Sequence, residues 1–189
     1  MTSILGRRTA SLLAGVAFLA APAFAANTTS LSYSLVLDNL ENPWDMAFLD
    51  DGTMFFTEKC KGLSVLMPDG SVNALLGMGG SEGYNSTADD LLCEGQAGMM
   101  GVAVDPGFAE NRRIYVYSTS NMTAPGTNRL MRLVVADDFS GVSDRTDIVD
   151  DVQYKPKASD HPFGVPGAHT GSRVRFGPDG ALWLTTGDT

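Results

Sequence analysis

Three side chains in this sequence of 189 residues could together form a site for proton transfer: His169, Asp188 and Gln96. Imidazole is the side chain whose free pKa lies nearest neutrality, so His169 could accept a proton at working pH. A carboxylate at Asp188 could orient the ring and stabilise its protonated form. The carboxamide of Gln96 could both donate and accept hydrogen bonds to a substrate hydroxyl.

Each of these residues also has a purely structural interpretation. His169 could belong to a surface loop, Asp188 could be a turn residue at the end of a strand, and Gln96 could be a loop amide that bonds to backbone. The choice depends on the elements that position the three side chains.

Short strands are the elements that the sequence predicts. Past the N-terminal segment there is no sustained helical periodicity, and apolar or alternating runs are bounded by Gly, Pro, Asn and Asp. Their enrichment in β-branched and aromatic residues is typical of strands. The expected strands cover residues 33–37, 45–49, 53–58, 62–67, 101–105, 113–120, 128–136, 173–177 and 181–187.

An internal repeat suggests how these strands are grouped. The stretches "WDMAFLDDGTMFFTE", "GVAVDPGFAENRRIYVYST" and "SRVRFGPDGALWLTTGD" each hold an apolar strand, a turn with Asp and Gly or Pro, and a second strand that ends in Thr or Ser. Their starts are spaced by about 55 and then about 70 residues, which is the scale of a four-stranded propeller blade. The sequence therefore favours an all-β propeller, with an ordinary β-sandwich as the alternative.

Two long loops interrupt the pattern, at residues 77–98 and 143–171. Long loops in a compact domain are usually functional or disordered. The first ends near Gln96 and the second near His169, each flanked by small residues just before an apolar strand. In a propeller the strand nearest the axis follows the loop from the previous blade. Both side chains are therefore expected at one face, near the central channel, where polar groups could form a binding site.

The first 25 residues are predicted to be a secretory signal peptide. A basic pair at 7–8 precedes an apolar run over 10–20, and a small-residue cleavage site ends at Ala25. The apolar run is too short to span a bilayer, although a retained membrane anchor is the alternative. The arginine pair is also compatible with twin-arginine export. We expect a periplasmic or secreted protein with no membrane span after cleavage, whose domain comprises residues 26–189.

The formal net charge of −9 argues against a nucleic-acid partner. Binding to phosphates requires a basic face.

The chain has two cysteines, Cys60 and Cys93. In an oxidising compartment an even pair favours a disulfide. A metal site would require further ligands, and the sequence has no Cys-x-x-Cys motif or His-rich cluster. The sequence predicts a Cys60–Cys93 bridge, and two separate buried thiols are the alternative.

Three stretches, taken together, resemble the soluble pyrroloquinoline quinone (PQQ)-dependent sugar dehydrogenases. This is the glucose/sorbosone dehydrogenase family, which includes the aldose sugar dehydrogenases. The stretches are "ENPWDMAFLDDGTMFFTEK", "EGQAGMMGVAVDPGFAENRRIYVYST" and "HTGSRVRFGPDGALWLTTGD", and the resemblance runs from about Leu35 to the last residue. It implies an exported, six-bladed β-propeller that binds PQQ over its channel with calcium beneath, and about the first three blades lie within this sequence.

The resemblance also implies a role for each of the three polar residues. His169 matches the catalytic histidine of a His-x-Gly-Gly-Arg motif. It would take the proton from the anomeric hydroxyl of an aldose while hydride passes to PQQ, which leaves a lactone. Asp188, in "TTGD", matches the aspartate that partners this histidine, and Gln96, in "GQAG", matches a glutamine of the substrate and cofactor pocket. The electrons would then pass to a periplasmic acceptor.

The sequence departs from the family pattern in two places. Ser172 replaces the second glycine of the His-x-Gly-Gly-Arg motif, and Ala168 stands where the glucose-specific members carry an acidic residue, so a glucose-specific pocket is not expected. The resemblance places the calcium ligands and the basic residues that hold PQQ downstream of this sequence. No metal ligand is therefore assigned here, and we expect the 189-residue polypeptide alone to be an inactive fragment.

A non-redox propeller is the alternative function, as a binding module or a calcium-dependent lactonase. A binding module would not require His169 and Asp188 to meet. A lactonase would require several carboxylates and an asparagine that converge on a metal.

Overall fold

The computed structural model of the protein describes residues 30–78, 86–155 and 165–187. The chain divides into two units, residues 1–36 and 37–189. The described part of the first unit, residues 30–36, contains no strand, so the strand expected at 33–37 is wrong. Tyr33 is fully exposed. An alternating apolar run gains nothing as a strand unless another strand pairs with it and covers one face.

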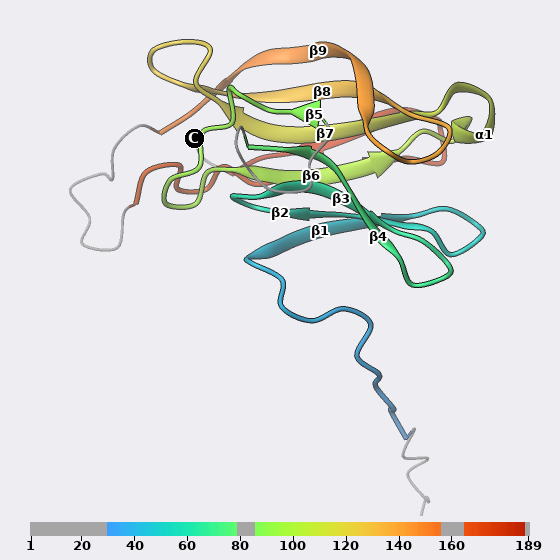
Figure 1. Ribbon diagram of the computed structural model, residues 1–189. Coiled ribbons are helices and arrows are strands. Elements are labelled where there is room, and N and C mark those ends of the chain that lie inside the picture. Colours follow the sequence, from blue (N-terminus) through green and yellow to red (C-terminus); the bar gives the residue numbers. More distant parts are fainter. Residues whose placement is uncertain (1–29, 79–85, 156–164, 188–189) are drawn as a thin grey trace, which may run out of the picture. The chain divides into compact units, whose positions relative to one another are not determined.

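The second unit begins with a five-stranded sheet of the order β1-β2-β3-β4-β5 (Figure 1). Its strands are β1 (Pro43–Phe48), β2 (Met54–Glu58), β3 (Gly62–Leu66), β4 (Val72–Gly77) and β5 (Ser86–Thr87). The first four pair antiparallel in sequence order, and β5 joins β4 in parallel. The sequence had suggested no strand for β4 or β5.

Asp-Gly turns join the strands where the repeat predicts them. Between β1 and β2, the backbone amide of Thr53 donates to the Asp51 carboxylate (2.8 Å), and Gly52 has a φ of +92°. Between β10 and β11, the amide of Ala181 donates to Asp179 (3.0 Å), and Gly180 has a φ of +77°. These aspartates serve turn geometry, since glycine adopts the left-handed region without cost and aspartate caps the turn.

The second sheet has the order β6-β7-β8-β9 and is antiparallel throughout. It contains β6 (Met99–Val104), β7 (Arg113–Ser120), β8 (Thr127–Val135) and β9 (Val142–Gln153), with the helix α1 (Phe108–Asn111) between β6 and β7. Strand β9 includes residues 143–153, which were expected to belong to the loop at 143–171, so that expectation is wrong for this part of the chain. Its sequence, VSDRTDIVDDVQ, holds five charged residues and is mostly exposed, which is how the free edge of a sheet avoids pairing with another chain.

The third sheet is the hairpin of β10 (Arg173–Phe176) and β11 (Leu182–Thr185). Two apolar cores lie among the three sheets. One contains Phe55, Val65 and Ile114, and the other contains Met100, Tyr117 and Val174. Strand β6 contributes to both, because successive side chains of a strand point to opposite faces, and its first five residues are buried.

The prediction of an all-β protein is confirmed. The three sheets are consecutive in sequence and do not close on themselves. Over the described ranges, no helix is long and apolar enough to cross a membrane.

Candidate functional site

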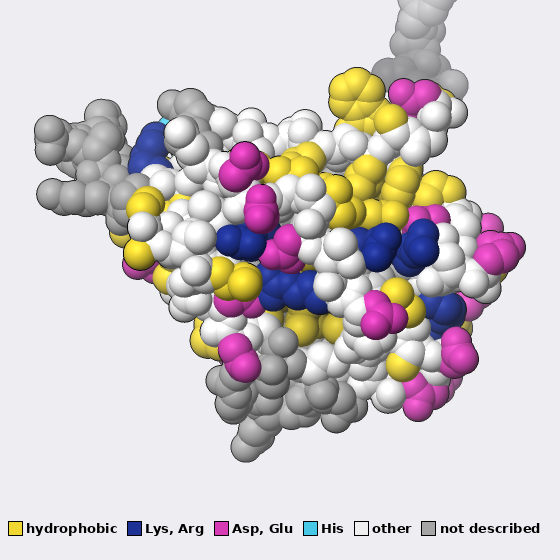
Figure 2. Space-filling view, turned by 90° about the horizontal axis from the view of Figure 1, so that it is seen from above, with side chains coloured by type: hydrophobic (Ala, Val, Ile, Leu, Met, Phe, Trp, Pro, Cys, Tyr) yellow, Lys and Arg dark blue, Asp and Glu magenta, His cyan; other side chains and the backbone are white. Residues whose placement is uncertain are grey.

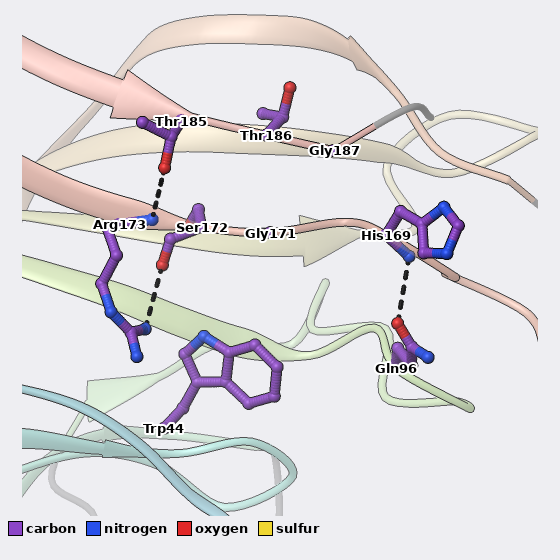
Figure 3. Close-up of a pocket in the computed structure, with 9 residues that line it drawn as sticks. All are labelled: Trp44, Gln96, His169, Gly171, Ser172, Arg173, Thr185, Thr186 and Gly187. Atoms are coloured by element: carbon purple, nitrogen blue, oxygen red, sulfur yellow. Dashed lines mark hydrogen bonds between the residues drawn. The ribbon is translucent and has the colours of Figure 1, made fainter.

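An open cleft of about 570 Å³ lies beside the start of β10 (Figure 3). Residues from three parts of the chain line it: the first sheet, the loop before β6, and the third sheet with the turn before it. The lining residues are Trp44, Gln96, His169, Gly171, Ser172, Arg173, Thr185, Thr186 and Gly187. Its size lies within the range of small-molecule sites.

His169 stands at the rim of this cleft, in the turn that precedes β10, and its side chain is exposed. Its backbone has a φ of +61°, in the left-handed region. Its amide donates to Oε1 of Gln96 (3.0 Å), and its carbonyl accepts from the amide of Gly187 (2.9 Å). A histidine in this backbone region is uncommon, and hydrogen bonds on both sides of the residue hold it there.

Gln96 lies close to His169, as the geometry of the two loops predicts. Its side-chain carbonyl accepts from His169, and its own backbone amide donates to the carbonyl of Pro166 (3.0 Å). Gln96 therefore contacts the turn before β10 through both its side chain and its backbone. Its two carboxamide N–H groups provide further donor capacity at the cleft.

Asp188 lies outside the described residues. The residue before it, Gly187, pairs with His169 through the backbone. A Cβ atom at Gly187 would lie 2.5 Å from the carbonyl oxygen of His169 and 2.7 Å from its Cβ. Only a glycine at this position allows the chain to approach the histidine so closely.

Trp44 and Arg173 are lining residues that sequence reasoning missed. Trp44 opens the first strand of the first repeat, and Arg173 ends the "HTGSR" stretch that carries His169. Nε1 of Trp44 and Oγ of Ser172 are buried and have no hydrogen-bond partner among the described residues. The signal that could have indicated Arg173 was its position four residues after the candidate histidine.

Arg173 contributes the guanidinium among the described residues that line the cleft. Its side chain is about half exposed, and its Nε lies 3.9 Å from the carboxylate of Asp45. Its Nη1 also donates to the carbonyl of Ser172 (3.3 Å). The cleft thus combines one guanidinium, one imidazole and one indole ring, an arrangement suited to a ligand with several oxygen acceptors.

A disulfide between Cys60 and Cys93 ties the loop that carries Gln96 to the first sheet. The two Cα atoms are 5.3 Å apart. This is the pairing that the sequence predicts, and it excludes the alternative of two separate thiols. Close by, Nζ of Lys59 donates to the carbonyl of Gly95 (2.5 Å).

The sequence model of the Glucose / Sorbosone dehydrogenase family matches residues 40–189. The chain belongs to the glucose/sorbosone dehydrogenase family. The match includes all three sheets and every described residue of the cleft.

Two curated relatives are consistent with membership of the glucose/sorbosone dehydrogenase family. The aldose sugar dehydrogenase YliI of Escherichia coli K12 is 28% identical over 165 residues, which is 84% of this chain and 38% of that protein. The uncharacterized protein slr1608 of Synechocystis is 30% identical over 163 residues, which is 86% of this chain and 37% of that protein. The chain therefore spans less than two fifths of the length of either relative.

Solved structures show the same fold. The PQQ-bound aldose sugar dehydrogenase of Streptomyces coelicolor superposes with a TM-score of 0.61 at 22% identity, covering 80% of this chain and 40% of that one. A glucose dehydrogenase superposes with a TM-score of 0.63 at 24% identity, covering 82% and 43%. The antiparallel sheets of this member of the glucose/sorbosone dehydrogenase family thus match structures of PQQ sugar dehydrogenases.

Proposed function

We propose that this protein oxidises the anomeric hydroxyl of aldose sugars to lactones with PQQ, and that His169 is the general base. The observation that supports this proposal most directly is the placement of His169. It lies at the rim of a cleft, beside Gln96, in a family of sugar dehydrogenases. We also propose that the three sheets are consecutive blades of a six-bladed propeller.

The proposed reaction removes a proton and a hydride from the sugar. The imidazole of His169 accepts the hydroxyl proton at a ring nitrogen, as the hydride leaves the anomeric carbon and the carbonyl of the lactone forms. The carboxamide N–H groups of Gln96 orient the sugar through hydrogen bonds to its oxygens. Asp188, whose backbone neighbour Gly187 contacts His169, stabilises the imidazolium that results.

The residues of the cleft fit one edge of PQQ, which is a planar quinone with three carboxylates. The ring of Trp44 offers an aromatic surface, and the half-exposed Arg173 offers a partner for a carboxylate. The orphaned N–H of Trp44 and hydroxyl of Ser172 are further donors for oxygen acceptors. When bound, PQQ supplies the two-electron oxidant that protein side chains lack. We propose that a periplasmic electron acceptor then regenerates it.

The described residues do not form a binding site for calcium. They contain no group of three or more His, Cys, Asp or Glu side chains that could hold a metal ion. No step of the proposed mechanism is assigned to calcium, and its ligands stay a prediction for other parts of the protein.

We propose export to the periplasm or beyond. The expected signal peptide lies outside the described residues. The Cys60–Cys93 disulfide supports the proposal, because such bonds persist in oxidising compartments. N-terminal sequencing of the protein from a periplasmic extract checks it, with a new terminus expected near Ala26.

The test of the proposed function compares the chain's two histidines. His169→Asn in the purified protein, loaded with PQQ and calcium, is expected to lower the aldose-dependent reduction of an artificial acceptor by about 10²–10⁴-fold. His161→Asn, at the chain's other histidine, which lies outside the described residues, is the matched control and is expected to leave turnover unchanged. Turnover of the His169→Asn variant within about threefold of the wild type contradicts the assignment.

The same assay applies to the polypeptide of 189 residues expressed alone. Its expected inactivity stays a prediction, and aldose-dependent turnover by this polypeptide would contradict it.

A further inference from the structure

We propose that Gln96 is a positioning residue for His169. We also propose that the Cys60–Cys93 disulfide determines how firmly Gln96 holds the His169 backbone in place. The inference rests on the proposed function of His169 as a base. It differs from the expectation that Gln96 serves only the ligand, because the side-chain oxygen of Gln96 is already engaged by the protein.

The backbone of His169 is held in the left-handed region. Its φ of +61° costs a non-glycine residue about 1–2 kcal/mol relative to the ordinary helical region. Such a conformation persists only where the surroundings enforce it. The 3.0 Å hydrogen bond from the His169 amide to Oε1 of Gln96 constrains the residue on its N-terminal side. The Gly187 amide, which donates to the His169 carbonyl, constrains it on the other side.

The loop that carries Gln96 fits closely against the turn before β10. A Cβ atom at Gly95 would lie 2.2 Å from the carbonyl oxygen of Pro166, and a Cβ atom at Gly167 would lie 2.5 Å from the Cβ of Ala97. Both glycines have positive φ values. The loops therefore meet backbone to backbone on either side of Gln96, which places the Gln96 backbone directly beside the turn that carries His169.

Residues 88–98, the segment that carries Gln96, are anchored to the sheets outside the cleft. Cys93, three residues before Gln96, is bonded to Cys60. The amide of Leu92 donates to the carbonyl of Thr119 (3.0 Å). These bonds attach the segment to the first and second sheets, so the position of Gln96 is set by covalent and hydrogen-bonded links outside the cleft.

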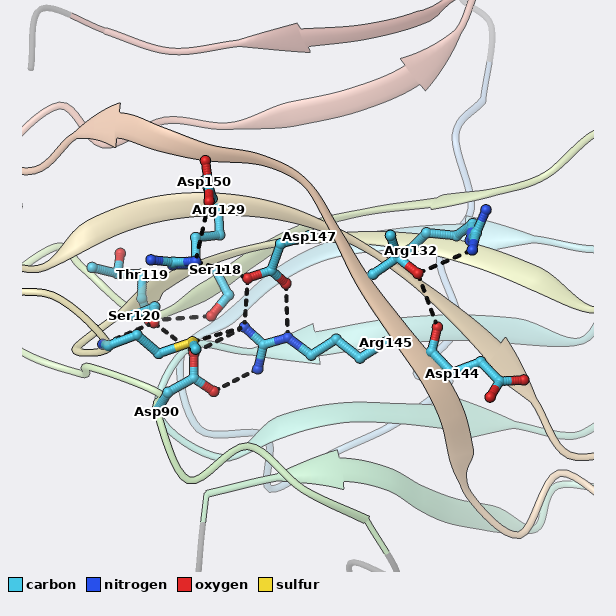
Figure 4. Close-up of polar contacts among 12 residues, drawn as sticks. Asp90, Ser118, Thr119, Ser120, Arg129, Arg132, Asp144, Arg145, Asp147 and Asp150 are labelled. Carbon is cyan, nitrogen blue, oxygen red and sulfur yellow. Dashed lines mark hydrogen bonds and ion pairs between the residues drawn. The ribbon is translucent and has the colours of Figure 1, made fainter.

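A charged network holds the other end of the same segment (Figure 4). Both terminal nitrogens of Arg145, on β9, donate to the carboxylate of Asp90 (2.6 and 2.9 Å), and its Nε donates to Asp147 (2.8 Å). The hydroxyl of Ser120 also donates to Asp90 (2.5 Å). Figure 2 shows basic side chains among acidic ones on this face of the molecule. Because the network remains when the disulfide is reduced, reduction would loosen the segment near Gln96 without releasing it.

The test measures amide hydrogen exchange of His169 by NMR, with no cofactor or sugar present. Gln96→Leu removes the acceptor and keeps a similar volume, and it is expected to speed exchange at His169 by about tenfold or more. Gln96→Glu keeps an oxygen acceptor and is expected to stay within about threefold of the wild type. Gln153→Leu, at the chain's other glutamine, which is exposed at the end of β9, is the matched control.

Amides of β7 and β8 report whether each variant is folded. If these amides stay protected and Gln96→Leu leaves exchange at His169 unchanged, the positioning role is wrong. If Gln96→Leu unfolds the protein, Gln96→Met, which also removes the amide acceptor, takes its place. Unchanged exchange at His169 in a folded Gln96→Met variant overturns the positioning role.

The disulfide arm uses Cys60→Ser with Cys93→Ser. An increase of about threefold or more in His169 exchange, with β7 and β8 still protected, supports the link from disulfide to site. No change contradicts that link.

Turnover separates this inference from the proposed function. In the loaded protein, Gln96→Leu is expected to lower kcat more than it raises KM, and Gln96→Glu is expected to recover most of kcat. If Gln96→Leu speeds exchange at His169 but His169→Asn keeps full turnover, the positioning is right and the proposed function is wrong. If His169→Asn is inactive and Gln96→Leu leaves exchange at His169 unchanged, the proposed function is right and the positioning role is wrong.

Discussion

Arg175 binds the carboxylate of Asp45, 130 residues earlier in the chain, through both of its terminal nitrogens (2.9 and 2.7 Å). The same carboxylate accepts from the backbone amide of Val102 (3.1 Å), and Arg175 also donates to the carbonyl of Val102 (3.1 Å). Asp45 lies on β1, Val102 on β6 and Arg175 on β10. One ion pair therefore joins the first strands of all three sheets, and β10 follows directly on the turn that carries His169.

Replacing Asp45 by Asn is expected to lower the free energy of unfolding by about 2–3 kcal/mol, because it leaves Arg175 without its charged partner while the Asp45 site stays buried. The Asp45 side chain is 4% exposed. Urea denaturation measures the change. Asp137→Asn is the control, since Asp137 is fully exposed beside Arg112, and its effect is expected to stay within about 0.5 kcal/mol. Equal effects of the two substitutions would show that the Asp45–Arg175 pair adds nothing.

Replacing Gly187 by Ala is expected to displace His169. The added methyl group would overlap the carbonyl and Cβ of His169, so the hydrogen bond between the two residues breaks. We expect turnover of the loaded protein to fall about tenfold or more, with a loss of stability of only about 1–2 kcal/mol. Gly107→Ala is the control, because the nearest atoms to its new methyl group belong to flexible side chains. Unchanged turnover in Gly187→Ala would rule out the close approach as a requirement.

Acid is expected to weaken the anchoring of residues 88–98. Burial raises the pKa of the Asp90 carboxyl, but hydrogen bonds from Arg145 and Ser120 outweigh burial and hold this pKa below its ordinary value. A carboxyl whose pKa is lower in the folded state than in the unfolded state stabilises the fold above the unfolded pKa of about 4. That stability is lost as pH falls through the folded-state pKa.

Asp90→Asn should therefore lower the free energy of unfolding at neutral pH by about 1–3 kcal/mol. It should also reduce the loss of stability on acidification below about pH 4. Denaturation curves at several pH values measure both effects, with Asp151→Asn, at an exposed position of β9, as the control. If Asp90→Asn and the wild type lose the same stability on acidification, the loss comes from other carboxyls, such as Asp147, whose pKa is also lowered.

Removing the disulfide is expected to destabilise the protein. Cys60 and Cys93 are separated by 33 residues in the sequence. A cross-link that closes a loop of this length lowers the conformational entropy of the unfolded chain, which stabilises the folded state by about 3–4 kcal/mol. Cys60→Ser with Cys93→Ser should lower the free energy of unfolding by about that amount. Addition of a reductant to the wild-type protein should give the same result. A wild type that is insensitive to reductant during denaturation would contradict the expectation.

Local patterns predicted most of the strands. The alternating, β-branched and aromatic runs gave β1–β3, β6–β8, β10 and β11 within a few residues, and the Asp-Gly turns appeared where the repeat placed them. Strand β9 was missed because an edge strand carries charges that resemble those of a loop. The run at 33–37 was wrongly predicted as a strand. Its alternating apolar side chains would be buried only against a partner strand, and none pairs with it among the described residues.

The sequence by itself determined the all-β class, because strand patterns and turn chemistry are local properties of the chain. It also predicted the disulfide, from the number of cysteines, and the nearness of Gln96 to His169, from the order of the loops. Tertiary structure decided which atoms meet. The left-handed backbone of His169, the use of Oε1 of Gln96 as its acceptor, and the place of Trp44 and Arg173 in the cleft all depend on contacts between segments distant in sequence. Such contacts follow from the packing of three sheets against one another, which no local pattern encodes.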